Sequence, residues 1–365
     1  MRHAKLSPSS SSRWLSCTAS VKACEKYERT TNAQAEWGTD VHDIGEKMLK
    51  NEKWTCSDVE KVECAQEYVH YCKELITPNS EQFIEVEYSL EFIQPEMFGT
   101  GDFATFDKDK NHLDIVDLKT GHNLVEAEEN TQLMLYALGC INELDIFGYY
   151  PETVTLHIVQ TRANHTSSWT TSMKKLDDFR HFVTKQAVNI QLGKTEFSPS
   201  DKACKWCPHQ GECTALKEHV ETIVKGDFED LDDIDGHADK LSNDGIKKIL
   251  DNADLIESFV GAVKQVAVER INQGEEVEGY KLVESKTNRK WVDEEVVASY
   301  LKERNDGIDY YQAPKLKPMT QILKVLKDDE KIKEFVIKPE GKPVLAKNDD
   351  KRPSLKGVVE EFDVV

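Results

Sequence analysis

The 365-residue sequence predicts an α/β (α+β) protein in which helices flank a mixed central sheet, followed by a mainly helical C-terminal extension. Apolar residues recur at helical spacing early in the chain, and from about residue 83 they alternate as in a half-buried strand. After three such strands the helical pattern returns, giving the order helix, three strands, helix, strand, helix. A three-strand meander followed by a crossover helix and a further strand forms a mixed sheet.

Each element of this arrangement follows from local periodicity and from capping or turn residues. Serines at 9–12 are typical of an N-cap, so a short helix is expected at 13–15. Further on we expect helices at 38–50 and 59–76, strands at 83–90, 101–106 and 112–118, a helix at 127–144, a strand at 154–160 and a helix at 173–192.

The composition changes beyond about residue 220. A dense acidic stretch at 227–239 is typical of a solvated loop or an interaction surface. We expect a long helix at 244–272, a hairpin at 280–292, another helical segment and an extended Lys/Pro-rich tail at 338–356. The sequence therefore predicts a domain at 1–215 and an acidic, mainly helical extension at 216–365.

Composition and charge limit the class of protein. No run reaches the roughly 18 apolar residues of a membrane span, and the N-terminus lacks the apolar stretch of a signal peptide, so we expect a cytoplasmic protein with no membrane partner. Nine cysteines without an export signal favour metal ligation or free thiols over disulfides. A net charge of −20 argues against a surface that coats DNA throughout, although a local basic groove is compatible with it.

The segment 114–121 contains the first candidate site. Asp117 and Lys119 are two apart in a predicted strand, so their side chains project from the same face. Asp117 can hold Mg²⁺ or Mn²⁺, with the carbonyl of Leu118 as a further oxygen ligand, while Lys119 orients an attacking water or offsets phosphate charge. An exposed Asp–Lys pair is the simpler interpretation of these residues taken alone.

Two upstream motifs add groups of the same chemistry. Asp102 opens the preceding strand, where its carboxylate can approach Asp117, and two such carboxylates repel unless a cation lies between them. His42 and Glu46 are four apart on one face of a predicted helix. Taken singly, Asp102 is equally well a turn residue and the His/Glu pair an ordinary surface contact.

A fourth motif lies on the helix after the strands. Gln132 and Tyr136 are four apart on a leucine-rich helix and alone would form its polar edge. In order, G-x-x-x-H-x-x-x-E from residue 38, Gly-Asp at 101–102, D-x-K-T-G from residue 117 and Q-x-x-x-Y from residue 132 resemble RecB-type members of the PD-(D/E)XK nuclease superfamily. The resemblance covers roughly residues 35–140, and the ordered set is more specific than any one motif.

This resemblance implies a restriction-endonuclease-like core and a Mg²⁺- or Mn²⁺-dependent deoxyribonuclease, an exonuclease acting at DNA ends. It also implies a role for each matching residue. His42, Asp102 and Asp117 would bind metal together with the Leu118 carbonyl, Lys119 would be the catalytic lysine, Gln132 and Tyr136 would contact DNA or brace the site, and Glu46 and Glu87 occupy positions of supporting acidic residues.

A C-x2-C-x5-C cluster at 204–213 is the second candidate site. Three thiolates at this spacing can wrap one metal centre and leave one coordination position open. Candidates for the fourth ligand are Cys17, Cys24 and His209. A zinc site that uses His209 is the simpler interpretation.

RecB-like nucleases with an iron–sulfur staple, such as the B subunit of AddAB and the CRISPR-associated adaptation exonucleases, place one cysteine before the core and three after it. The segment 12–17 resembles their upstream element. The resemblance therefore implies a 4Fe–4S cluster rather than Zn²⁺, closing a loop of about two hundred residues and restricting the unfolded chain by several kcal/mol. Its ligands would be Cys17, Cys204, Cys207 and Cys213.

The C-terminal extension contains a basic and aromatic segment. Lys286, Arg289, Lys290 and Trp291 can grip a phosphate backbone and stack a base, or they can be solvated strand faces with one core tryptophan. With this extension the whole chain resembles an uncharacterised bacteriophage family encoded near replication and recombination genes.

That wider resemblance implies a phage recombination exonuclease in the bacterial host cytoplasm. Its partners would be DNA and a single-strand annealing or single-strand binding protein, docked by the tail or the acidic stretch. A non-catalytic DNA-end- or partner-binding module on the same fold is the alternative.

Overall fold

The computed structural model describes residues 4–27, 32–225, 242–287 and 289–304, and then 310–312, 315–316, 322–323, 325–326, 329–337, 341, 343–347 and 352–354. The chain divides into two compact units, Met1–Val260 and Gly261–Val365. This division lies later than the junction at 215/216 expected from composition. The acidic stretch at 227–239 and much of the Lys/Pro-rich tail lie outside the described residues.

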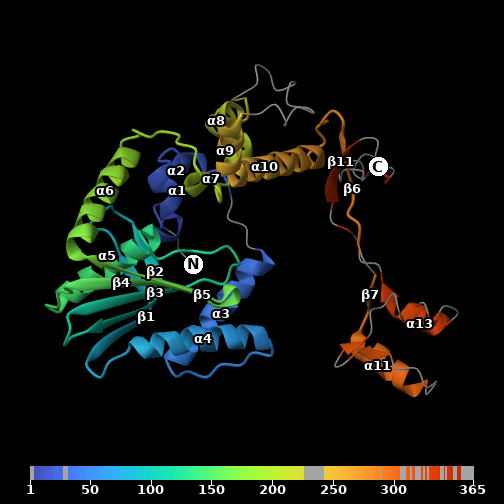
Figure 1. The fold of residues 1–365 in the computed structure, drawn as a ribbon, viewed down its shortest axis with the longest axis horizontal. Coiled ribbons are helices and arrows are strands. Elements are labelled where there is room, and N and C mark those ends of the chain that lie inside the picture. Colours follow the sequence, from blue (N-terminus) through green and yellow to red (C-terminus); the bar gives the residue numbers. More distant parts are fainter. Residues whose placement is uncertain are drawn as a thin grey trace, which may run out of the picture. The chain divides into compact units, whose positions relative to one another are not determined.

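The first unit is built on a five-stranded mixed sheet (Figure 1). Neighbouring strands are antiparallel except for the central pair, which is parallel and is joined by a crossover helix. The predicted mixed sheet flanked by helices is confirmed. In spatial order the strands are β1 (Ser80–Ser89), β2 (Phe98–Asp107), β3 (His112–Leu118), β4 (Thr153–Gln160) and β5 (His165–Ser172).

Strand β5 was not predicted. Its sequence, HTSSWTTS, lacks the apolar alternation that marks a half-buried strand. It lies at the edge of the sheet, paired along its whole length with β4 from Thr153↔Ser172 to Gln160↔His165, and alternate positions face solvent. Threonine-rich strands suit such an edge because β-branched side chains favour the pleated backbone without requiring a core.

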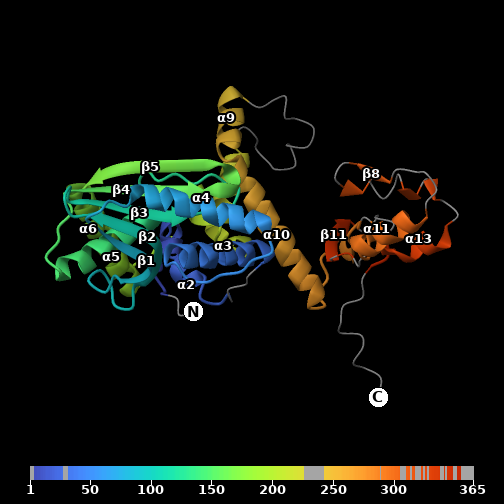
Figure 2. The same cartoon turned by 90° about the horizontal axis from the view of Figure 1, so that it is seen from below.

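Helices cover both faces of the sheet (Figure 2). On one face lie α5 (Thr131–Ile146), the crossover helix, and α6 (Met173–Gln191); on the other lie α3 (Ala33–Leu49) and α4 (Val59–Leu75). Leu113 and Ile115 of β3 pack on the first side, and Val116 and Leu118 on the second. Burial on both sides explains why apolar residues of this strand face both sides of the sheet.

The N-terminal segment lies against residues close to the cysteine motif. It comprises the 3-10 turn Pro8–Ser10 and helices α1 (Ser11–Ser16) and α2 (Ser20–Ala23). Trp14 is buried and donates its Nε1–H to the Ser7 carbonyl at 3.1 Å. The amide of Ala19 donates to the Glu196 carbonyl at 3.1 Å, so the N-terminal segment contacts the segment that follows α6.

Short helices complete the first unit, and the last one crosses into the second. They are α7 (Asp201–Cys204), the 3-10 turn Gln210–Glu212, α8 (Thr214–Val224), α9 (Asn243–Asp251) and α10 (Ala253–Asn272). The long helix expected at 244–272 is therefore two helices, interrupted at Asn252. No helix among the described residues is long and apolar enough to cross a membrane.

The second unit combines short strands and helices around its own small core. Strands β6 (Tyr280–Glu284) and β7 (Lys290–Trp291) do not pair with each other, so the predicted hairpin is wrong. β6 instead pairs with β11 (Pro343–Lys347), and β7 pairs with β10 (Val336–Ile337). The remaining elements are α11 (Glu294–Glu303), β8 (Tyr311–Gln312), β9 (Lys315–Leu316) and α13 (Glu330–Glu334).

Candidate active site and cysteine cluster

Two buried carboxylates lie on neighbouring central strands. The β2–β3 register pairs Phe103 with Val116, so the next position places Asp102 opposite Asp117. Both are almost fully buried, with 8% and 2% of their surface exposed. The amide of Leu118 donates to Asp102 Oδ2 at 2.7 Å. The structure thus brings the two predicted carboxylates together. Leu118, whose carbonyl was the expected metal ligand, contacts Asp102 through its backbone N–H.

A histidine and a third carboxylate complete one side of this group. His42, on α3, places its Nδ1 3.2 Å from Asp102 Oδ1 and 3.9 Å from Glu85 Oε1. One ligand atom from each of these three residues lies within 4.8 Å of the other two. Carboxylate oxygens are ligands that suit Mg²⁺ and Mn²⁺, and imidazole nitrogen is a common ligand of divalent transition metals.

Glu85 reaches the site through an unusual backbone conformation. Its φ is +50°, and the β1–β2 pairing is interrupted there between Ile84↔Phe103 and Val86↔Gly101. A non-glycine residue in this region costs about 1–2 kcal/mol, and such strain concentrates at functional sites. Of the two predicted supporting residues, Glu87 is exposed. Glu46 pairs with Lys50 at 2.6 Å, and its charge contributes to raising the pKa of Glu85.

The other side of the group is a closed hydrogen-bond network. Lys119 Nζ lies 2.7 Å from Asp117 Oδ2 and donates to Gln132 Oε1 at 3.0 Å. Gln132 Nε2 donates to Asp117 Oδ1 at 3.0 Å and to the Tyr136 hydroxyl at 3.1 Å. Asn130 caps α5 by accepting from the amides of Gln132 and Leu133, which fixes the first turn of that helix.

The charges explain how the group is held together. Burial by itself would lower the pKa of His42, but the charge and hydrogen bond of Asp102 outweigh it and raise that pKa to about 10. Burial opposes ionisation of Asp102, yet His42 holds its pKa below the usual value. Burial raises the pKa of Asp117 despite the nearby charge of Lys119. The positive charges of His42 and Lys119 therefore offset only part of the negative charge of the three carboxylates, Glu85, Asp102 and Asp117.

This donor set fits a divalent cation. Asp117 Oδ2 is buried and makes no hydrogen bond of acceptable geometry, although the Lys119 ammonium lies beside it. Burial also raises the pKa of Glu85, although the hydrogen bond from His42 opposes this effect. A nearby cation would therefore stabilise the ionised form of this carboxylate as well. A cation bound among His42, Glu85 and Asp102 would displace the imidazole proton and add one further positive charge where the carboxylates repel.

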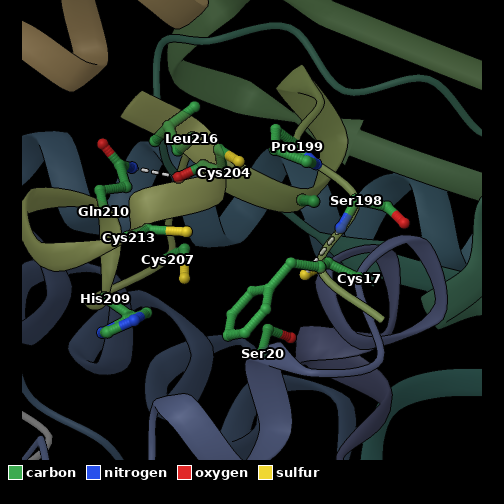
Figure 3. A pocket seen from close by; sticks show the side chains of 12 residues that line it. Cys17, Ser20, Ser198, Pro199, Cys204, Cys207, His209, Gln210, Cys213 and Leu216 are labelled. Atoms are coloured by element: carbon green, nitrogen blue, oxygen red, sulfur yellow. Dashed lines mark hydrogen bonds between the residues drawn. The ribbon is translucent and has the colours of Figure 1, made fainter. Parts of the chain in front are cut away.

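The predicted cysteine ligands also meet in space. Cys17, Cys204, Cys207 and Cys213 line one small cavity together with His209 (Figure 3). Cys17 Sγ accepts a hydrogen bond from the Ser198 amide at 3.5 Å, and the Cys204 carbonyl accepts one from the Gln210 side chain. Gln210 in turn accepts from the Ser258 hydroxyl at 2.9 Å, which ties the motif to α10.

Cys24, the alternative fourth ligand, lies beside the same motif. Its sulfur is 3.7 Å from Cys207 Sγ. The hydrogen bond from Cys207 lowers the pKa of Cys24 to about 6, against the effect of burial, and raises the pKa of Cys207. His209, which also lines the cavity, places its Nδ1 3.1 Å from the Tyr27 hydroxyl.

With both sites described, comparison with known proteins places the chain. A family model described as protein of unknown function (DUF2800) matches residues 3–353. This chain belongs to the DUF2800 family. The expectation that the whole chain represents an uncharacterised family is thereby confirmed. Among solved structures, the crystal structure of SSO0001 matches 54% of this DUF2800 chain and 95% of its own chain, at 13% identity and a TM-score of 0.24, values that carry no argument.

One residue that sequence patterns did not reveal fixes the loop after Lys119 in this DUF2800 chain. Gln160, fully buried at the end of β4, donates to the carbonyls of Gly121 at 2.6 Å and Asn123 at 2.8 Å, and accepts from the Val125 amide at 3.1 Å. All the polar atoms of this amide are therefore used within one loop. The sequence signal is a glutamine as the last residue of a largely apolar strand.

In the predicted basic and aromatic segment of the second unit, the basic residues are exposed and the tryptophan is buried. Lys286, Arg289 and Lys290 are exposed. Trp291 is only 9% exposed and packs in the core of that unit, which favours the interpretation of a core tryptophan over a base-stacking residue.

Proposed function

We propose that this chain is a RecB-type PD-(D/E)XK nuclease with a restriction-endonuclease-like core, a Mg²⁺- or Mn²⁺-dependent exonuclease that hydrolyses phosphodiester bonds at DNA ends in phage recombination or replication. The observation that carries the proposal is the convergence of His42, Asp102, Asp117 and Lys119 from one helix and two strands. A protein that only bound DNA would have no need to bury this group.

The roles follow from the contacts. His42, Glu85, Asp102 and Asp117 would hold the cation, which when bound activates water and neutralises the charge that develops on the phosphate. Lys119 holds its proton at Nζ, because the charge of Asp117 raises its pKa against the effect of burial. It therefore presents a positive charge to a phosphate oxygen.

Gln132 and Tyr136 act as positioning residues in this proposal. The amide of Gln132 bridges Asp117 and Lys119, so it sets the direction of both groups. The Tyr136 hydroxyl accepts from that amide and prevents it from rotating. DNA is the substrate, and a single-strand annealing or single-strand binding protein is the proposed partner.

The proposal includes a 4Fe–4S cluster held by Cys17, Cys204, Cys207 and Cys213. These four cysteines line one cavity. A centre bound there would join the N-terminal segment to the end of the core.

Nuclease activity is tested on the full-length chain with linear DNA and Mg²⁺ or Mn²⁺. Lys119→Met should abolish the release of nucleotides while the melting temperature stays close to that of the parent. The matched control is Lys110→Met on the exposed β2–β3 turn, where the lysine pairs with Asp107, and it should retain full activity. Equal digestion by the parent and Lys119→Met would refute the assignment, and so would metal-independent DNA binding without cleavage.

The cluster is tested separately. Anaerobically purified protein should be brown, with broad absorbance near about 400 nm, and should contain iron and sulfide. Cys213→Ser should lose both, whereas Cys140→Ser, a cysteine buried in the core away from this cavity, should not. Colourless protein that contains zinc would refute this part of the proposal alone.

A further inference from the structure

Two cysteines that are 183 residues apart in the chain are in contact. Cys24 Sγ and Cys207 Sγ lie 3.7 Å apart, which is about 1.7 Å longer than a disulfide bond. Neither is buried; both are of intermediate exposure, so a small reagent can reach them. The two sulfurs therefore need only a small displacement to bond.

Contacts next to the pair hold it in place. The Tyr27 hydroxyl donates to Glu212 Oε1 at 2.9 Å and lies 3.1 Å from His209 Nδ1. Lys26 forms an ion pair with the same glutamate. Residues 24–27 are thus fixed against residues 207–212 by three protein contacts that require no metal.

Two of the other cysteines around the cavity, Cys17 and Cys204, are less accessible to a reagent. Cys17 is 7% exposed and its sulfur is engaged with the Ser198 amide and the Glu196 carbonyl. Cys204 is also 7% exposed. Accessibility as well as distance therefore distinguishes Cys24 and Cys207 from Cys17 and Cys204.

We propose that Cys24 and Cys207 form a thiol pair that small-molecule disulfides such as oxidised glutathione convert to an intramolecular disulfide. The thiolate of Cys24 attacks one sulfur of the small disulfide, whose S–S bond breaks and releases one small thiol. Cys207 then attacks the Cys24 sulfur of this mixed disulfide, forms the Cys24–Cys207 bond and releases the second small thiol. The two protein thiols are oxidised, the small disulfide is reduced, and the two thiol protons pass to the released thiols.

The oxidised pair excludes metal binding by Cys207, a consequence that rests on the proposed cluster. A sulfur committed to a disulfide has no thiolate to offer iron. Cys207 can therefore either form the disulfide or bind the cluster, but not both. In an oxidising thiol pool, a newly made chain would remain without the cluster. Cys24 acts here without being a cluster ligand.

The test uses full-length protein that has been reduced, stripped of metal by a chelator under anaerobic conditions, and then exposed to oxidised glutathione. Free thiols are blocked with N-ethylmaleimide, and tryptic peptides are analysed by mass spectrometry without reduction. The expected product joins the peptide 23–26 to the peptide 206–217, with Cys213 carrying the blocking group. Cys213→Ser should give the same linkage and thereby assign it to Cys207.

Two controls make the result specific. Cys24→Ser should lose the linked peptide, whereas Cys56→Ser, at a partly exposed cysteine elsewhere in the unit, should keep it. Recovery of the peptide 23–26 with a free thiol or a stable glutathione adduct would overturn the proposal. A dominant bond between Cys207 and Cys204 or Cys213 would overturn it as well.

A second measurement addresses the consequence for metal. After treatment with oxidised glutathione, the parent should lose its ability to take up ferrous iron and sulfide, whereas Cys24→Ser should retain it. Equal uptake by the two oxidised proteins would overturn the exclusion. If neither protein takes up iron even when fully reduced, the proposed cluster fails, while the peptide result still decides the thiol pair.

Discussion

Binding of Mn²⁺ to the metal-free protein at pH 7 is expected to release about one proton, and His42 is its source. In the absence of metal, Asp102 raises the pKa of His42 to about 10, so the imidazole is charged at pH 7. A metal ligand must be neutral imidazole, and the proton therefore has to leave when the cation binds.

The size of the effect follows from the same pKa. Each pKa unit corresponds to about 1.4 kcal/mol, so displacing this proton at pH 7 opposes metal binding by at most about 4 kcal/mol. Solvent screening reduces that figure, because 31% of the His42 side chain is exposed. The sign is fixed: affinity rises with pH, by up to about tenfold per unit, until the pH passes the pKa of the metal-free protein.

Isothermal titration calorimetry in two buffers of different ionisation enthalpy measures the number of protons released. His42→Gln is the matched control, because it keeps a polar side chain of similar reach and removes the titrating group. The variant should bind Mn²⁺ more weakly and with little dependence on pH between 6 and 8. Mn²⁺ binding by the parent without proton release would refute the reasoning, since His42 would then be neutral or would not be a ligand.

Three further expectations concern folding and positioning. Under the proposed function, Gln160→Met should lower kcat much more than it changes KM, because it removes the three hydrogen bonds that hold the loop after Lys119, and faster hydrogen exchange at 121–125 should accompany the loss. Gly139→Ala should destabilise the fold by about 1–3 kcal/mol, because a Cβ there would lie 2.5 Å from that of Tyr88, whereas Gly261→Ala, where a Cβ meets nothing within 4 Å, should be neutral or stabilising in thermal denaturation. Glu85→Gly should raise the free energy of unfolding by about 1 kcal/mol through relief of its left-handed backbone, and should weaken Mn²⁺ binding.

These outcomes would be contradicted by distinct observations. Unchanged exchange at 121–125 in Gln160→Met would show that the loop is held by other contacts. Equal melting temperatures for the two alanine variants would mean that the α5–β1 contact adjusts freely. Glu85→Gly that melts below the parent would show that the carboxylate stabilises the fold more than its backbone conformation strains it.

Local patterns were sufficient for elements whose apolar residues lie close together in sequence. Strand β3 was predicted with its exact limits, and α4 to within one residue, because strand-like apolar runs and helical spacing are properties of short segments. Strand β5 was missed because an edge strand needs no apolar alternation. The hairpin at 280–292 was wrong because the partners of β6 and β7 lie about fifty residues further along the chain, and local sequence does not encode such pairing.

The candidate site shows the same division. Spacing alone placed Asp117 and Lys119 on one face, and the ordered motifs indicated His42 and Asp102 as their neighbours. Glu85 could not be distinguished from Glu87, because both have the same strand parity and only the positive φ of Glu85 selects it. The contact of Cys24 with Cys207 likewise depends on how the N-terminal segment crosses the end of the core.

That crossing has a consequence for synthesis of the chain. Some contacts of the N-terminal segment are with residues 196–213, which leave the ribosome about two hundred residues later. At roughly 5–20 residues per second, the first cysteines wait on the order of 10–40 s for their partners. During that interval the thiols of the N-terminal segment are exposed to metal carriers and oxidants, so a metal or an oxidant can react with them before the cavity closes.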